Sequence, residues 1–348
     1  MKFGTMMLAA GALALAIPAG ASVASADGHM VKGPKVSWKL SLWGKRRAFT
    51  EGMEYVSAQV AEKTGGNFKI RLYYGGQLSK AKENLDGISL GAFEAAGFCA
   101  AYHPGKNEPL NVLDLPFLPV KDFKAQRAMN DAVYAHPDAK KALAKWNATL
   151  YMSNILPQYE YMGKGEPPQS VSDFKGKTLR ALGGMGAAAL LIGATPSTMP
   201  ASETYTALQR GTVDAIGFPY TYTFVSYKIV EISDWVTTNM KLGSVNCPTV
   251  FNTNSYNKLP QQYKDLLESL KGGAYDAIES AYVAQDAKNI ADWKAEGRLK
   301  MVEIPENEMD EFRRIAGQPV WTKWVEDHKD KFAAQELFDI ALAKATGK

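Results

Sequence analysis

Cysteine and histidine are scarce in this sequence, whose 348 residues include two cysteines and four histidines. Two cysteines are too few for a disulfide-stapled scaffold or for a cysteine-rich zinc site. The histidines are far apart, and neither the HExxH motif of zinc proteases nor the GxSxG motif of α/β hydrolases is present. We therefore expect neither a metal site nor an enzymatic nucleophile.

Clusters of one charge are also lacking. The 40 Lys and Arg against 36 Asp and Glu leave a formal net charge of +4, and no block of five or six basic residues occurs. Such a chain lacks the electrostatic footprint of a nucleic-acid-binding protein. With 46% hydrophobic and 22% charged residues it has an ordinary globular composition, and its length favours two domains.

Long apolar runs are confined to the N-terminus. Residues 6–17 are apolar and rich in alanine, Lys2 precedes them, and residues 24–26 (ASA) have the form of a signal-peptidase site. The run is shorter than the about 20 residues that span a bilayer. We predict a signal peptide over residues 1–26, cleavage after Ala26 and export to the periplasm. Export makes NAD, ATP and other cytosolic cofactors poor candidates, and we expect no cofactor.

The exported part alternates strands with helices. This β-α-β-α-β order favours a parallel sheet with helices on its faces, and the pattern restarts after about residue 156, as expected of a second domain. The predicted strands are at 36–42, 68–74, 92–98, 149–155, 177–182 and 213–218, and the predicted helices at 49–60, 81–90, 122–135, 138–146, 187–192 and 203–210.

Helices predominate after Pro260. Apolar residues at helical spacing from Tyr263 to Trp293 predict one helix of about 36 residues, in which the glycines at 272–273 favour a kink. At about 1.5 Å per residue it would be roughly 54 Å long, more than the diameter of one small domain. We therefore expect it to bridge two domains. Closing helices are predicted at 308–315 and 320–343.

Two features allow more than one interpretation. Gly184-x-Gly186-x-x-Ala189 imitates a dinucleotide-binding fingerprint, but its preceding strand is short and is not the first of its domain, and export also disfavours a nucleotide. Cys99 and Cys247 lie in separate strand-like stretches. They could pair only if their Cα atoms lie within about 7 Å, and we predict two buried free thiols instead.

The most distinctive motifs follow one another between residues 173 and 214. They read DFKGKTLR at 173–180, GATP at 193–196 and MPASETYTALQRGTVD at 199–214, with shorter matches at 76–78 (GQL), 113–117 (LDLPF) and 259–260 (LP). In these residues the chain resembles the substrate-binding proteins of tripartite ATP-independent periplasmic (TRAP) transporters, of the dicarboxylate-binding type. The resemblance covers essentially the whole exported part.

The resemblance implies an α/β fold, the two-lobed clamshell of periplasmic binding proteins, in which each lobe is a mixed sheet flanked by helices and one long helix bridges both. We expect lobe I to contain residues 27–156 and about 247–284, and lobe II residues 157–246 and about 285–348. It also implies a non-enzymatic transport protein that encloses a small organic acid and delivers it to the TRAP membrane permease. We expect a monomer that does not bind nucleic acid.

The resemblance places the ligand carboxylate on Arg180, and the planar fork of a guanidinium suits a bidentate, charge-assisted pair with a carboxylate. Many relatives carry a second arginine about twenty residues earlier, where an ungapped count reaches Glu160. A carboxylate there would repel a second anionic group on the ligand. Because the other candidates are mostly aromatic, and aromatic faces also attract cations, we expect a monocarboxylate with an aromatic ring or a cationic head. The other candidate ligand-binding residues are Trp43, Glu83, Phe98, Tyr102, Tyr159, Phe218 and Tyr222.

Two other functions stay open at this point. An exported ligand-sensing module for a membrane receptor would share the same sequence features, because it too would close around a ligand. An exported lyase or hydrolase acting on small acids would need a nucleophile, a metal or an acid–base motif, and we find none in the sequence.

Overall fold

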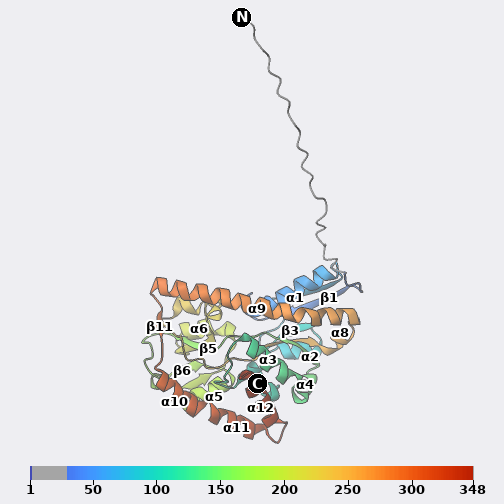
Figure 1. Ribbon diagram of the computed structural model, residues 1–348. Coiled ribbons are helices and arrows are strands. Elements are labelled where there is room, and N and C mark those ends of the chain that lie inside the picture. The colour runs from blue at the N-terminus through green and yellow to red at the C-terminus, as the bar shows by residue number, and fades with distance from the viewer. Residues whose placement is uncertain (2–29, 348) are drawn as a thin grey trace.

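The computed structural model describes Met1 and residues 30–347, so the predicted signal peptide and its cleavage site lie outside the described residues. The described chain forms two mixed β-sheets flanked by helices, and one long helix runs past both (Figure 1). We call the part built on the first sheet lobe I and the part built on the second sheet lobe II. No helix of residues 30–347 is long and apolar enough to cross a membrane.

Lobe I is built on a five-stranded sheet in the order β2-β1-β3-β10-β4. β1 pairs in parallel with β2 and β3, as the sequence predicts, whereas β10 is antiparallel to both of its neighbours. The strands are β1 (Val36–Ser41), β2 (Phe68–Tyr73), β3 (Ala95–Gly97), β4 (Ala148–Ser153) and β10 (Pro248–Asn252). The helices of this part are α1 (Ala48–Lys63), α2 (Asn84–Leu90), α3 (Phe123–Ala135), α4 (Pro137–Ala144) and α8 (Thr253–Asn257).

Lobe II is built on a six-stranded sheet in the order β11-β9-β5-β8-β6-β7. β5 is antiparallel to β8 and β9, and the other pairs are parallel. The strands are β5 (Tyr159–Gly163), β6 (Thr178–Arg180), β7 (Thr195–Ser197), β8 (Ala215–Pro219), β9 (Trp235–Thr237) and β11 (Lys300–Val302), and the helices are α5 (Gly183–Leu191), α6 (Thr204–Gln209) and α7 (Tyr222–Ser226).

The predicted bridging helix is present as α9 (Gln261–Glu296), 36 residues without interruption. Its N-terminal part buries Tyr263 and Leu270 against the core of lobe I, and its C-terminal part buries Trp293 in the core of lobe II. Gly273 has a packing role, because a Cβ at this position would overlap the hydroxyl of Tyr55 on α1. The glycine therefore lets α1 and α9 approach closely.

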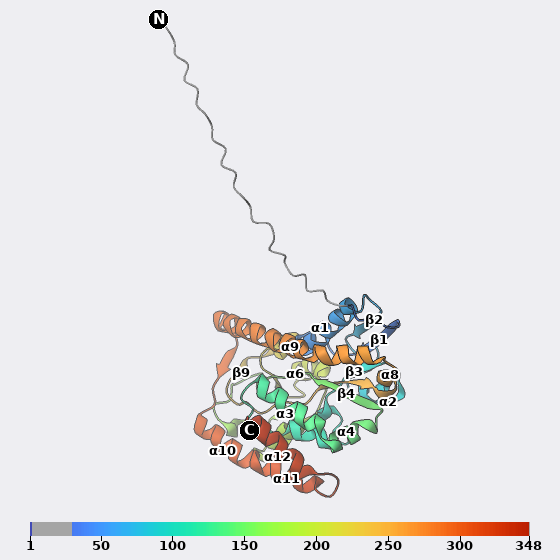
Figure 2. The same cartoon turned by 45° about the vertical axis from the view of Figure 1, so that its right-hand side comes forward.

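The last C-terminal helix packs on a helix of lobe I. The predicted helix at 320–343 is two helices, α11 (Gln318–His328) and α12 (Ala334–Ala345), which follow α10 (Glu306–Ala316). α12 lies beside α3 of lobe I (Figure 2) and buries Leu337 against the cluster that contains Met129. Sequence periodicity reveals an apolar face on α12 but not the lobe that covers it.

Cys99 and Cys247 form a disulfide, so the prediction of two free thiols is wrong. Phe98 N donates to Pro248 O at 3.0 Å, and Ala100 N donates to Asn246 O at 2.9 Å. These bonds extend the antiparallel β3–β10 ladder and place the cysteines opposite each other, at a non-hydrogen-bonded position where side chains lie closest. This pairing is set by long-range register, which neither local stretch reveals.

Candidate functional site

A cavity of about 30 Å³ lies between the lobes and is lined by residues of both. Several of its walls lie at or just beyond the carboxyl ends of β1, β3, β6 and β8, the edge at which open α/β sheets bind ligands. The lining residues are Trp43, Arg47, Phe49, Cys99, Tyr102 and Cys247 from lobe I, Leu156 at the junction, and Tyr159, Arg180, Ala201, Phe218, Pro219, Thr223 and Tyr227 from lobe II.

Arg180 is the last residue of β6 and only 1% exposed. Its Nη1 donates to Gly217 O at 2.6 Å, and its Nε and Nη2 donate to Met199 O at 3.3 and 3.2 Å. Nη2 also donates to Tyr102 Oη at 3.4 Å, and the guanidinium lies 4.7 Å from the ring centre of Phe218. All of these partners are neutral, so within residues 30–347 the charge has no carboxylate partner.

Tyr102 connects the two lobes beside this guanidinium. It belongs to lobe I, yet its hydroxyl accepts hydrogen bonds from Arg180 Nη2 and, at 3.0 Å, from Ala201 N of lobe II. Tyr159 lies on the same cavity at the start of β5. Burial raises the pKa of its hydroxyl, and the charge of Arg180 opposes part of that rise. The Tyr159 hydroxyl is therefore protonated at neutral pH.

Arg47, which is not among the predicted site residues, is 4% exposed and lines the same cavity. Its Nη1 donates to Trp43 O at 3.1 Å and to Lys45 O at 2.8 Å, and its guanidinium lies 4.7 Å from the ring centre of Phe49. The neighbouring Arg46 is exposed and pairs with Glu51 at 2.8 Å. Nothing in the sequence shows which of two adjacent arginines is buried.

Glu160 is not among the residues that line the cavity. One carboxylate oxygen accepts from Thr237 Oγ1 at 2.6 Å and from Met240 N at 3.1 Å, and the other accepts from Lys241 N at 2.9 Å. Burial raises the pKa of this carboxyl to about 7. Glu160 therefore holds the segment after β9, and its contacts give no reason to exclude a second anionic group from the cavity.

Of the nine predicted residues, the structure brings five together on the cavity: Trp43, Tyr102, Tyr159, Arg180 and Phe218.

The other predicted residues besides Glu160 also lie outside the cavity lining. Phe98 is buried in the neighbouring core of lobe I, and Tyr222 packs against Tyr282 of α9 with ring centres 6.1 Å apart. Glu83 is exposed at the start of α2, where its carboxylate accepts from Lys80 N at 3.2 Å. Ungapped counting and strand-end position do not fix the direction of a side chain, so the sequence could not show which candidates line the cavity, and the ligand-binding role of these residues stays a prediction.

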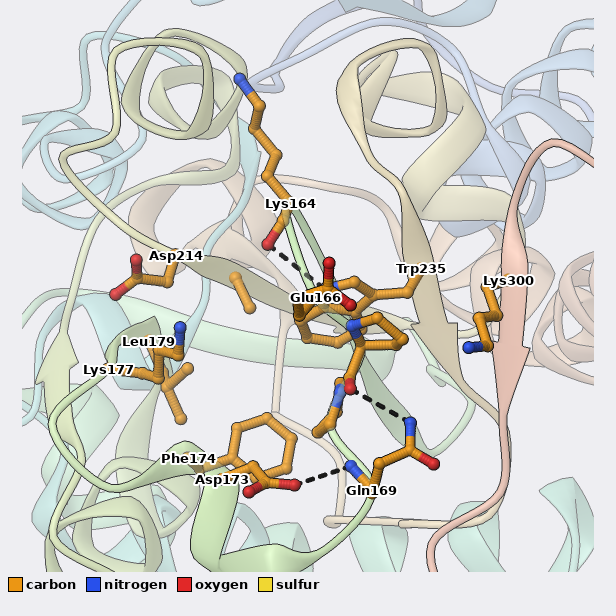
Figure 3. Close-up of a pocket in the computed structure, with 13 residues that line it drawn as sticks. Lys164, Glu166, Gln169, Asp173, Phe174, Lys177, Leu179, Asp214, Trp235 and Lys300 are labelled. Carbon is orange, nitrogen blue, oxygen red and sulfur yellow. Dashed lines mark hydrogen bonds between the residues drawn. The ribbon is translucent and has the colours of Figure 1, made fainter.

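A second, larger hollow of about 440 Å³ lies on lobe II and is lined by Lys177 and Leu179 at the start of β6 (Figure 3). Lys177 and Asp214 line one side and Lys300 the other. The Asp173 carboxylate accepts a hydrogen bond from Gln169 N at 2.7 Å, so Asp173 is engaged within its own loop. The hollow mixes both charges and is lined by lobe II alone, so the cavity between the lobes is the better candidate site.

Two α/β lobes that enclose a cavity at the carboxyl ends of their strands define a two-lobed solute-binding protein. The chain belongs to the bacterial extracellular solute-binding proteins of family 7, the DctP family, whose model matches residues 41–327. The resemblance to the TRAP solute-binding proteins is thereby confirmed. Proteins of this family are periplasmic components of transport systems and not enzymes.

Individual relatives bind different acids. The C4-dicarboxylate-binding periplasmic protein DctP of Rhodobacter capsulatus is 25% identical over 292 residues, 82% of this chain and 84% of that protein. A monocarboxylate 2-oxoacid-binding periplasmic protein of Nostoc sp. is 24% identical over 292 residues, 81% of this chain and 78% of that protein. The crystal structure of a TRAP solute-binding protein from Rhodoferax ferrireducens in complex with copurified benzoate shares the fold, with a TM-score of 0.80, 20% identity and coverage of 90% of this chain and 98% of that one.

Proposed function

We propose that this protein captures a small carboxylate between its lobes and delivers it to a TRAP permease in the membrane. The observation that carries the proposal is Arg180, a buried guanidinium on a cavity shared by both lobes, whose hydrogen-bond partners among residues 30–347 are all neutral. A buried cation without a counter-ion is costly. A ligand carboxylate would supply the missing negative charge, and the relatives that bind dicarboxylates, 2-oxoacids and benzoate support this class.

The ligand class that best suits the remaining walls is a carboxylate with a flat, apolar part. Trp43 packs edge-on to Tyr102 with ring centres 5.9 Å apart, and Phe49 lies 5.2 Å from Trp43. These rings form an apolar wall beside Arg180. The alternative of a ligand with a cationic head loses its basis, because Glu160 lies outside the cavity lining and Arg47 lies on it. We therefore favour an aromatic acid.

Closure of the lobes would complete this site. The hydrogen bonds to Tyr102 Oη from Arg180 and Ala201 join one lobe to the other directly beside the cavity. In the mechanism we propose, the ligand binds to one open lobe, closure surrounds it and removes water from Arg180, and the permease recognises the closed shape. This scheme needs no enzymatic chemistry and no ATP.

A thermal-shift screen of the exported form with benzoate, succinate and pyruvate tests the proposal. A bound ligand at 100 times its dissociation constant is expected to add about 2.7 kcal/mol to the free energy of unfolding. Arg180→Ala is expected to weaken binding by about 2–5 kcal/mol, since it removes the partner of a buried charge. Arg46→Ala is the matched control, because Arg46 is exposed and paired with Glu51. Failure of a wider panel of carboxylates to stabilise the protein would overturn the proposal.

A further inference from the structure

Tyr227 carries a buried hydroxyl without a hydrogen-bond partner in the described part of the chain. Tyr227 follows α7, lines the cavity and packs against Phe218 with ring centres 5.4 Å apart. Its oxygen lies tightly against Gly44, where φ is +68° and any Cβ would overlap it. Buried hydroxyls nearly always have a partner, so an unpaired one beside a ligand cavity indicates that the ligand supplies it.

The guanidinium next to this hydroxyl cannot accept a hydrogen bond from it. The guanidinium of Arg47 lies 5.6 Å from the ring centre of Tyr227, and a guanidinium can only donate. Burial raises the pKa of the Tyr227 hydroxyl, and the charges of Arg47 and Arg180 both oppose that rise. The hydroxyl is therefore a protonated donor close to two cations, a setting that suits an oxygen acceptor with negative charge.

Arg47 adds further donors to the same end of the cavity. The hydrogen bonds of its guanidinium all come from Nη1 and end on the carbonyls of Trp43 and Lys45, so within residues 30–347 its Nε and Nη2 have no such bond. Both carbonyls are neutral, and no carboxylate of the described residues forms an ion pair with Arg47. The adjacent Arg46 is paired with Glu51, which shows that the local sequence could have supplied a counter-ion.

Two arginines and two aromatic residues that line the cavity contact one another in succession. The guanidinium of Arg180 lies over Phe218, Phe218 packs against Tyr227, and Arg47 lies over Tyr227. Arg180 thus contacts one ring of the Phe218–Tyr227 pair and Arg47 contacts the other. A single carboxylate held by Arg180 would leave the donors of Arg47 and Tyr227 without an acceptor.

We propose that the ligand carries a second oxygen group, in addition to the carboxylate held by Arg180, and that Arg47 and the Tyr227 hydroxyl bind it. The inference rests on the proposed function and narrows its ligand class to acids with a second hydroxyl, oxo or carboxylate oxygen. Arg47 and Tyr227 are then the residues that set specificity, and Arg180 sets the requirement for an acid.

Calorimetric titration with matched ligands tests this inference. Benzoate, 3-hydroxybenzoate and isophthalate differ only in the second oxygen group, and butyrate with succinate forms an aliphatic pair. The wild type is expected to bind the ligands that carry the second group at least about 10-fold more tightly than benzoate or butyrate, which lack it. This is the effect of a hydrogen bond to a charged group. Tyr227→Phe removes one oxygen and is expected to weaken the binding of the ligands with the second group more than the binding of benzoate and butyrate. Arg47→Met is expected to have a larger effect of the same kind.

Controls separate this inference from the proposed function. Arg180→Ala is expected to weaken all five ligands, and Tyr222→Phe, a tyrosine outside the cavity lining, none of them. Equal affinity within each pair in the wild type, or a parallel loss for all ligands in Tyr227→Phe, would overturn the inference while the proposed function stands. If the wild type binds no carboxylate, both fail. Tyr227→Phe keeps the test decisive if Arg47→Met unfolds, because Arg47 Nη1 also braces the loop at 43–45.

Discussion

At the scale of single residues, the geometry of Arg180 matters as well as its charge. Its guanidinium donates in several directions at once, to Met199 O, Gly217 O and Tyr102 Oη. A lysine would keep the charge but lose the planar fork that suits a carboxylate. We expect Arg180→Lys to recover only part of the affinity lost in Arg180→Ala, measured by calorimetric titration with benzoate or succinate. Wild-type affinity in Arg180→Lys would show that charge alone is recognised.

Glu160 is expected to control stability and not the choice of ligand. Burial raises its pKa from 4.5 to about 7, so the folded state binds the proton more tightly than the unfolded state. Its stabilising contribution is full below about pH 4.5 and is lost as the pH rises through about 7. Urea denaturation should show the unfolding free energy of the wild type falling across this window relative to that of Glu160→Gln. The ratio of succinate to butyrate affinity should be the same in both proteins.

Two outcomes would contradict this view of Glu160. Parallel stability curves for the wild type and Glu160→Gln would mean that the carboxyl titrates alike in the folded and unfolded states. A gain in succinate binding in Glu160→Gln would mean that the Glu160 carboxylate repels a second anionic group of the ligand.

At the scale of elements, the packing of α1 on α9 assigns different roles to two adjacent glycines. A Cβ on Gly272 would meet no atom within 4 Å, whereas a Cβ on Gly273 would overlap the Tyr55 hydroxyl. Gly272→Ala is therefore expected to raise the free energy of unfolding by about 0.5–1 kcal/mol, the helix preference of alanine over glycine. Gly273→Ala should show no such gain or a net loss, measured by urea denaturation. A similar gain in both variants would show that Tyr55 moves aside at little cost.

At the scale of the whole molecule, the Cys99–Cys247 disulfide joins segments 148 residues apart and lines the cavity. A cross-link over so long a loop restricts the unfolded chain, an effect of about 3–5 kcal/mol. The double variant Cys99→Ser with Cys247→Ser is expected to lose this much unfolding free energy in non-reducing buffer. Dithiothreitol should destabilise the wild type to a similar extent and leave the variant unchanged. Equal stability of the two proteins without reductant would show that the bond contributes little.

The sequence by itself predicted the features that depend on contiguous residues. Apolar spacing predicted most strands and the 36-residue helix from Gln261 to Glu296, and the motifs at 173–180 and 199–214 indicated the family and pointed to Arg180. These predictions succeed because hydrogen bonding within a helix and alternation along a strand are local. Short strands such as β9 and β11, with three residues each, carry too little pattern to be recognised.

Only the tertiary structure decided which distant groups meet. The β3–β10 register brought the two cysteines together, α12 packed on α3 of lobe I, and the segment after β9 supplied hydrogen-bond donors to the Glu160 carboxylate. The same holds for Arg47 and Tyr227, which are far apart in the chain and become neighbours only when the lobes come together. The physical reason is common to all of them: burial and partner choice depend on surfaces that meet across long loops, and no local pattern encodes them.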